Sequence, residues 1–490
     1  AGTMKRVTKN GGDAHFGADN DKIFYTTSQS GSYGTKRKLV EVNLDGFDQR
    51  DVLKGDEVTE FKISPDGQWV AFTYQFNAYV APFGKVGKLQ SIGPKSTWVP
   101  VKQASKTAGS ELHWSADSST LHWSNASFLY SRKLAETFAH LAGENVELPE
   151  ATSEGIDLSF SVKADAPNSK IALVGGRVVT MRDADSTQEV IENGIVLVDG
   201  NRIVSVGSAS DMAIPSGYKT VNVTGKTLLP GLIDAHAHGS QGVRQLIPQQ
   251  NWKNFSSLAF GVTTLHDPSN DNREIFAAAE MLRAGKIIGP RIFSTGRILY
   301  AGYSPGATAK IDTLEDARFH IQRTKENGAV SVKSYNHPRR DTRQQVLAAG
   351  RELGVNVVPE GGGKLYQNIS MVIDGHTTLE HALNVPRGYD DLTQLWRQTG
   401  TAYNPTFVVA YGGITGERYW YDRTNVWENE RLMRYVPRYI VEPIAIRREK
   451  APDDHYNHFE VAKYAKTLRD NGVRVLIGAH GQREGLAAHW

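Results

Sequence analysis

The second half of the chain alternates short apolar stretches with longer amphipathic ones. Helical stretches with capping residues lie between most of the apolar ones. Eight strands that alternate with helices predict a parallel (β/α)8 barrel, a TIM barrel. The eight apolar stretches of strand length lie at 228–238, 261–268, 290–296, 329–335, 355–361, 377–383, 402–408 and 473–480.

A different pattern repeats over residues 1–165. Each repeat has an apolar start, a Ser/Gly-x-Asp turn and a strand rich in Ile, Val, Phe or Trp, at 15–27, 61–74 and 112–124. All-β repeats with a period of about 40–50 residues are typical of propeller blades. These repeats resemble the TolB-like, PD40-type propeller family. Since a propeller needs at least about four blades, we expect a partial β-propeller.

Residues 166–229 form a third segment. Strands rich in Val and Ile alternate there with glycine turns, and Asp199-Gly200-Asn201 predicts a hairpin between two of them. We expect this segment to be the N-terminal part of a small β-sandwich. The predicted fold is therefore multi-domain: a partial β-propeller at 1–165, the sandwich part at 166–229 and the barrel at 230–490, which ends after its eighth strand.

Composition narrows the function classes. The formal net charge of the 490 residues is only +3 and basic residues form no long run, so nucleic acid is not indicated as a partner. No apolar run reaches the roughly 18 residues that a membrane span needs. The absence of cysteine excludes disulfides, thiolate zinc sites and cysteine nucleophiles. Chemistry based on histidine, lysine and carboxylates remains.

The first predicted barrel strand ends in His236-Ala237-His238. Residues two apart on a strand point the same way, so both imidazoles are expected to face the barrel interior. Two imidazoles side by side at a barrel mouth favour a metal site. The alternative is a pair of buried histidines whose nitrogens are satisfied by hydrogen bonds.

The stretch LLPGLIDAHAH at 228–238 resembles the amidohydrolase superfamily of metal-dependent hydrolases, and the resemblance extends over about 166–490. It implies a (β/α)8 barrel with one or two divalent metals, zinc first. It also implies metal ligation by His381 on strand 6 and by Lys333 on strand 4, carboxylated so that it bridges two metals. For Lys333 the alternative is a lysine that reaches solvent or pairs with a carboxylate.

The chain departs from the superfamily pattern on two strands. Strand 5, where a histidine is usual, carries Glu360, and strand 8, where an aspartate is usual, carries His480. Each change alone suggests a lost site. Together they preserve the inventory of four histidines, one lysine and one acid, so we expect a working site with permuted ligands. A decayed, non-catalytic barrel is the alternative.

Catalysis in such a site needs a proton acceptor near the activated water. His480 and Glu360 are the candidates, and if His480 binds metal the role falls to Glu360. His266, next to Asp267, and Tyr335 and His337 lie at strand ends where they are expected to contact substrate, although simple solvation of loop residues explains them equally well. The long segment 411–470 is expected to be a lid or a packed helical insertion.

The resemblance implies hydrolysis of C–N bonds, and the dipeptidase and prolidase-like branch is the most similar part of the superfamily. A dipeptide or an N-acyl amino acid is the expected substrate class. A lactone or phosphotriester hydrolase is the chemical alternative, and a propeller–barrel binding protein without activity is the other. A periplasmic or secreted location is implied only by the resemblance. Because the sequence accounts for too few propeller blades and sandwich strands and for no last barrel helix, we expect further segments of a longer polypeptide, or oligomer partners, to complete the fold.

Overall fold

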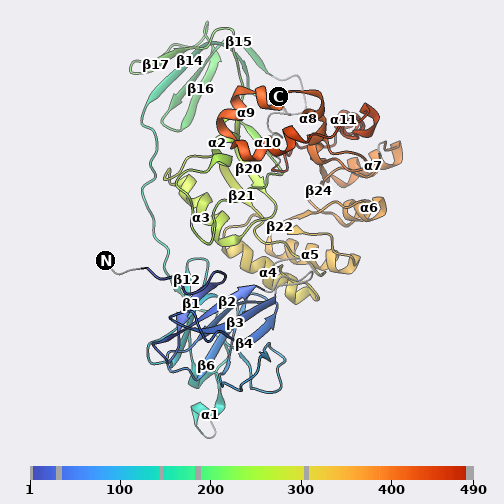
Figure 1. The fold of residues 1–490 in the computed structure, drawn as a ribbon. Coiled ribbons are helices and arrows are strands. Elements are labelled where there is room, and N and C mark those ends of the chain that lie inside the picture. The colour runs from blue at the N-terminus through green and yellow to red at the C-terminus, as the bar shows by residue number, and fades with distance from the viewer. Residues whose placement is uncertain are drawn as a thin grey trace.

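The computed structural model describes residues 4–28, 36–143, 147–151, 153–182, 189–302, 308–385 and 387–481. The N-terminal region folds into three mainly antiparallel sheets, one for each sequence repeat (Figure 1). Within the described residues these three sheets form no closed ring, so the predicted propeller is not confirmed. A short helix, α1 (Ala139–Ala142), lies between the last two strands of the third sheet.

The strands of the three sheets follow the chain order closely. The first sheet contains β1 (Gly12–Phe16), β2 (Lys22–Ser28), β3 (Lys36–Asn43), β4 (Arg50–Asp56) and β8 (Gln90–Ser91). The second contains β5 (Val58–Ile63), β6 (Trp69–Tyr74), β7 (Asn77–Pro82) and β9 (Lys102–Gln103). The third contains β10 (Ser110–Trp114), β11 (Thr120–Asn125), β12 (Phe128–Lys133) and β13 (Ile156–Asp157).

A single five-stranded sheet follows, drawn at the top of Figure 1. The predicted hairpin at Gly200 is confirmed, because Asp199 pairs with Arg202 across it. The face that carries Ala172, Ile195 and Leu197 is buried. The strands are β14 (Lys170–Val179), β15 (Val190–Asp199), β16 (Arg202–Ser208), β17 (Lys219–Asn222) and β18 (Thr227–Leu228).

The C-terminal half alternates strands and helices as predicted, with helices around the outside of the strands in Figure 1. Its strands are β19 (Leu232–Asp234), β20 (Val262–Asp267), β21 (Arg291–Ser294), β22 (Ser331–Ser334), β23 (Asn356–Pro359), β24 (Thr378–Glu380) and β25 (Ala402–Asn404). Its first six helices are α2 (Trp252–Ala259), α3 (Asn272–Arg283), α4 (Leu314–Glu326), α5 (Arg340–Leu353), α6 (Leu365–Asp374) and α7 (Asp390–Thr399).

Backbone hydrogen bonds join these strands one after another. β19, β20 and β21 pair in parallel, as do β22 with β23 and β24 with β25. The chain beyond β21 pairs with β22 through Leu299, and Glu360 bridges to Glu380 between β23 and β24. The eighth predicted strand is shorter than expected: Val475 bridges to β25, and the Ala235 N–H donates to the Ile477 carbonyl at 2.9 Å. The pairings thus return to β19, an arrangement compatible with the predicted barrel.

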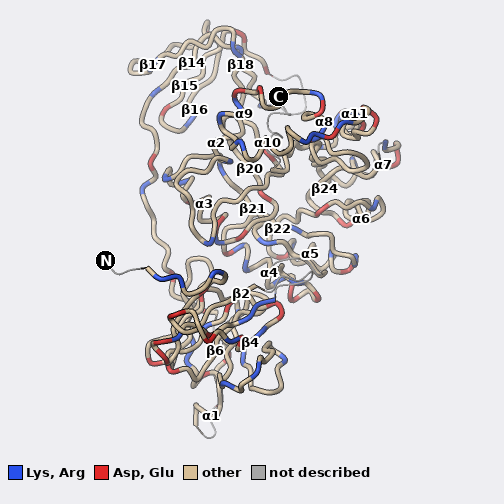
Figure 2. The backbone as a smooth tube through the Cα atoms, in the orientation of Figure 1, with Lys and Arg blue, Asp and Glu red and all other residues tan. Residues whose placement is uncertain are grey.

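The N-terminal sheets contact α3 and α4 of the C-terminal half. The Phe76 ring lies 3.9 Å from the guanidinium carbon of Arg323, and the Asn125 side chain donates to Glu326 at 2.7 Å. Arg273 on α3 pairs with Glu111. Figure 2 shows basic and acidic residues interspersed along the backbone, in keeping with the small net charge. Within the described part of the chain, no helix is long and apolar enough to cross a membrane.

Candidate metal centre

Four imidazoles converge where the ring of strands ends. His236 and His238 follow β19, His381 follows β24, and His480 ends the last stretch that pairs with β25. Five of the ring pairs have centroid separations of 4.8 to 5.0 Å. The Nε2 atoms of His236 and His238 lie 3.1 Å apart, so the two rings point to the same place as the sequence predicts.

The backbone holds two of these histidines in an unusual conformation. His381 has a φ of 69° and His480 a φ of 59°, both in the left-handed region that non-glycine residues rarely occupy. The His480 N–H donates to the carbonyl of His236 at 2.6 Å, which fixes the stretch 473–480 against the residues that follow β19. Gly478 is required there, since a Cβ at this position would lie 2.6 Å from the Cβ of His236.

Glu360 adds a carboxylate to the cluster. Its Oε2 lies 2.5 Å from the Nζ of Lys333, and its Oε1 lies 2.9 Å from the Nε2 of His381. Burial alone would raise the pKa of Glu360, but the Lys333 ammonium and His381 outweigh burial and hold this pKa well below its usual range. Lys333 is only 1% exposed and forms an ion pair with Glu360. Pairing with a carboxylate is the alternative that the sequence left open beside a carboxylated lysine.

The outer nitrogens of three histidines are engaged by other side chains. His236 Nδ1 lies 2.5 Å from Glu380 Oε2, and His381 Nδ1 lies 2.9 Å from the hydroxyl of Thr406. His238 Nδ1 lies 3.4 Å from Asp267. Such partners fix the ring orientation of metal-binding histidines and leave Nε2 for the metal.

The roles of Glu380, Thr406 and Asp267 in holding these rings were not predicted from the sequence. Glu380 stands next to His381 in the sequence, yet it contacts His236, which lies 144 residues away in the chain. Only the closure of the strand ring brings these two side chains together.

The electrostatics favour uncharged imidazoles. Burial lowers the pKa of His236 well below its ordinary value, and the nearby Lys333 ammonium acts in the same direction. Burial also lowers the pKa of His381, against the opposing effect of Glu360. Burial raises the pKa of Glu380 to about 7. Uncharged imidazoles keep the lone pairs that a metal requires.

The donor set fits a divalent cation. One ligand atom from each of His236, His238 and His480 lies within 4.8 Å of the others, and His381 and Glu360 adjoin this triad. Imidazole nitrogens with a carboxylate oxygen are ligands that zinc and related transition metals prefer.

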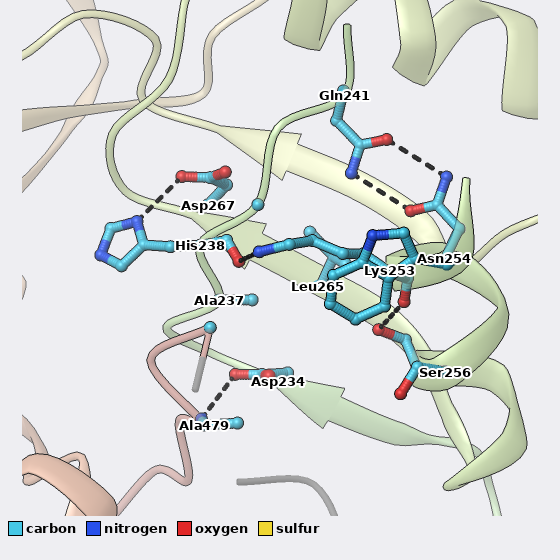
Figure 3. Close-up of a pocket in the computed structure, with 14 residues that line it drawn as sticks. Asp234, Ala237, His238, Gln241, Lys253, Asn254, Ser256, Leu265, Asp267 and Ala479 are labelled. Atoms are coloured by element: carbon cyan, nitrogen blue, oxygen red, sulfur yellow. Dashed lines mark hydrogen bonds and ion pairs between the residues drawn. The ribbon is translucent and has the colours of Figure 1, made fainter. Parts of the chain in front are cut away.

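A small cavity of about 50 Å³ lies beside His238. Figure 3 shows the Lys253 ammonium donating to the His238 carbonyl, at 3.3 Å. Asp234 accepts from the Ala479 N–H at 3.0 Å, which ties the last stretch of chain to β19, and burial raises the pKa of Asp234 to about 6. The hydrogen bond between Asp234 and Ala479, which both line the cavity, therefore joins the stretch that carries His236 and His238 to the stretch that carries His480.

The three predicted substrate residues have different surroundings. Tyr335 is half-buried, and burial together with Glu360 raises its pKa, so it lies on the Glu360 side of the cluster. His266 Nε2 lies 2.8 Å from the Ser331 hydroxyl, and burial lowers its pKa to about 4. His337 is fully buried, and its Nδ1 accepts from the Ala301 N–H at 3.0 Å. His337 thus exposes no atom at the rim in this structure.

A further tyrosine, Tyr411, was missed because it lies outside the strands. Its ring centroid is 5.6 Å from that of His381, and burial together with Glu360 raises its pKa to about 12. Tyr411 begins the long segment that carries α8 (Gly416–Arg423), α9 (Glu430–Tyr435), α10 (Arg438–Ile446) and α11 (His458–Asp470). This segment has its own buried cluster, which packs against Phe260, as a packed helical insertion would.

Comparisons with known proteins give partial matches. No family model matches the chain. The chain is 28% identical over 165 residues to a dihydroorotase from Wolbachia sp. subsp. Brugia malayi (strain TRS), covering 33% of the chain and 34% of that protein. It is 38% identical over 71 residues to an imidazolonepropionase from Fusobacterium nucleatum subsp. nucleatum, covering 13% of the chain and 17% of that protein. The chain therefore spans about a third or less of the length of these relatives.

Two solved structures are also similar. A putative prolidase from Bifidobacterium longum has 18% identity and a TM-score of 0.47, covering 65% of this chain and 77% of that one. A Xaa-Pro dipeptidase has 16% identity and a TM-score of 0.46, covering 66% and 83%. The sequence matches thus show similarity to a dihydroorotase and an imidazolonepropionase over parts of the chain.

Proposed function

We propose that the chain is a metal-dependent hydrolase that cleaves C–N bonds of amide or peptide-like substrates, such as dipeptides or N-acyl amino acids. The observation that carries this proposal is the convergence of four imidazoles and the Glu360 carboxylate, with the outer nitrogens of three rings already engaged. The names of the relatives, a dihydroorotase and an imidazolonepropionase, point to ring amides and related C–N bonds.

The proposed metal ligands are His236, His238, His381, His480 and Glu360. A divalent cation held by them, with zinc the best match, would lower the pKa of a bound water towards about 7 and polarise a carbonyl. We further propose that the chain belongs to the amidohydrolase superfamily and that the strand ring is the (β/α)8 barrel of that superfamily. The N-terminal sheets are proposed to be blades of a TolB-like propeller.

Lys333 has two proposed states. The 2.5 Å contact with Glu360 is compatible with an ammonium, whose positive charge would compensate the buried carboxylate. A carboxylated Lys333 would instead place a second negative charge beside Glu360, so it requires two bound cations. Protein incubated with 13C-bicarbonate and zinc shows a carbamate resonance by NMR if Lys333 is carboxylated, and shows none if the ion pair persists.

His480 and Glu360 are the two proposed acceptors of the proton from the attacking water. A metal-bound imidazole has no lone pair left for a proton, so His480 can accept a proton only where it does not bind the metal. We propose that Glu360 takes the proton from the attacking water if His480 is a ligand, and that His480 takes it and delivers it to the leaving nitrogen if His480 only adjoins the metal.

Metal analysis and kinetics test the proposal together. The purified protein should contain one or two equivalents of zinc or a similar metal, and it should hydrolyse members of a panel of dipeptides and N-acyl amino acids. His480→Ala should lower kcat by about 100-fold or more, whereas the matched variant His113→Ala, at an exposed position in β10, should not.

Three outcomes would contradict the proposal in different ways. Turnover of lactones or phosphotriesters alone would leave the metal centre and replace the substrate class. Protein without stoichiometric metal and without turnover would favour a binding protein. Unchanged metal content and activity in both Glu360→Gln and His480→Ala would refute the permuted ligand set.

A further inference from the structure

Residues 156–162 alternate apolar and polar side chains but lie mostly outside the sheets. The apolar residues are Ile156, Leu158, Phe160 and Val162, which are 63%, 57%, 85% and 55% exposed. Alternation of this kind is typical of a strand that buries one face. Exposed apolar side chains that lie together usually mark a surface that binds a partner.

Only the start of this stretch has a strand beside it. β13 pairs antiparallel with the first residues of β12, and the Leu158 N–H donates to the Ser127 carbonyl at 2.9 Å. From Phe160 to Ala164, no backbone group bonds to another residue in the part of the chain that the structure describes. In Figure 1 this stretch belongs to the long teal trace that joins the N-terminal sheets to the five-stranded sheet. Its backbone is therefore available to pair with another strand.

We propose that residues 157–163 form an interaction surface for a second copy of this chain, and that the two stretches pair as antiparallel strands about a twofold axis at Phe160. Opposite residues then stand equally far from Phe160 on either side. Leu158 lies opposite Val162 and the two phenylalanines lie opposite each other, so the apolar side chains of both copies share one face of the ribbon. Such a surface is self-complementary, as a twofold interface requires.

The charges favour a second copy as the partner, and they favour this register. Asp157 of each copy lies opposite Lys163 of the other, and opposite charges across two strands are favourable. Both residues are exposed, and Lys163 has no ionic partner among the described residues. A parallel pairing would instead set Lys163 beside Lys163, and an axis at Ser161 would set Asp157 opposite Asp165. Both alternatives bring like charges together.

Sedimentation velocity of the full chain measures this association. Because the surface is small, we expect a reversible dimer with a Kd of about 10–100 μM, at the weak end of protein interfaces. Phe160→Asp sets two carboxylates against each other at the axis and should weaken the dimer by about tenfold or more. The matched control is Phe47→Asp, since Phe47 is 71% exposed between β3 and β4, and it should leave the Kd unchanged. A wild type that stays monomeric at about 200 μM would overturn the proposal, as would a dimer that Phe160→Asp does not weaken.

Charge exchange and cross-linking test the register. Asp157→Lys and Lys163→Glu should each weaken self-association by about fivefold or more, whereas a mixture of the two variants should form heterodimers as readily as the wild type forms its dimer. Because the chain contains no cysteine, Phe160→Cys places a single thiol at the axis and should give a disulfide-linked dimer on mild oxidation, whereas Phe47→Cys should not. A mixture that does not recover association, or no cross-link through Phe160→Cys, would overturn the antiparallel pairing.

Discussion

Replacing Lys333 by methionine removes the positive partner of Glu360. The Nζ and Oε2 atoms are 2.5 Å apart, which at an effective dielectric constant of about 20 corresponds to a gross attraction of roughly 7 kcal/mol. Desolvation of both groups offsets much of this, and removing one partner of a buried pair typically costs about 3–5 kcal/mol. Because His381 also contacts Glu360 and can take up a proton, we expect Lys333→Met to cost about 3 kcal/mol.

Urea denaturation of chelator-treated protein at pH 7, followed by circular dichroism at 222 nm, measures this cost. Among the described residues, all the α-helices except the four-residue α1 lie in the C-terminal half, so the helical signal reports on the region that contains the pair. Lys364→Met is the matched control, since Lys364 is exposed just before α6, and it should change the free energy of unfolding by less than about 0.5 kcal/mol.

A double-mutant cycle with Glu360→Gln isolates the pair. Glu360→Gln alone leaves the Lys333 ammonium buried and should cost about 3–5 kcal/mol. The double variant contains neither charge and should be more stable than either single variant, by about 2 kcal/mol. If the two single effects simply add, the 2.5 Å contact does not stabilise the fold and the reasoning is wrong.

Three more predictions follow from contacts elsewhere. Thr406→Val removes the hydroxyl that holds His381 and should weaken zinc binding by about 10- to 100-fold in competition with a chromogenic chelator; an unchanged affinity would contradict this role. His15 accepts from the Ile63 N–H, and burial lowers its pKa to about 4, so stability present above pH 6.5 should fall by about 3 kcal/mol as the pH drops to 4. In His15→Gln the urea midpoint should depend less on pH; an equal dependence would rule out His15. Phe76→Ala should expose Arg323 and speed amide exchange in α4, and unchanged exchange would show that this contact does not hold the N-terminal sheets.

The paired histidines were predictable because their spacing is local. Two residues that are two apart at a strand end must lie close together, and the 3.1 Å separation of their Nε2 atoms agrees. The contact between Lys333 and Glu360 joins neighbouring strands. The sequence indicated both a carboxylated Lys333 and a Lys333 paired with a carboxylate. The contact between His236 and Glu380 was not visible, because it depends on how the whole ring of strands closes.

In the fold, too, the locally encoded features were predictable and the others were not. Alternating apolar stretches placed the strands, since the strand period and the glycine turns are encoded locally, as the hairpin at Gly200 illustrates. The last stretch, 473–480, pairs only briefly, through a bridge at Val475 and backbone hydrogen bonds to Tyr403 and Ala235, and it then bends into the left-handed turn at His480. Apolar composition alone does not reveal such a bend.

The left-handed backbone at His381 and His480 also carries a cost in stability. Glycine adopts this conformation freely, whereas a side chain with a Cβ costs about 1 kcal/mol or more at each position. The fold therefore bears an expense of about 2 kcal/mol at the two positions where it presents an imidazole to the cluster, and glycine at either position would relieve that strain while removing a nitrogen donor.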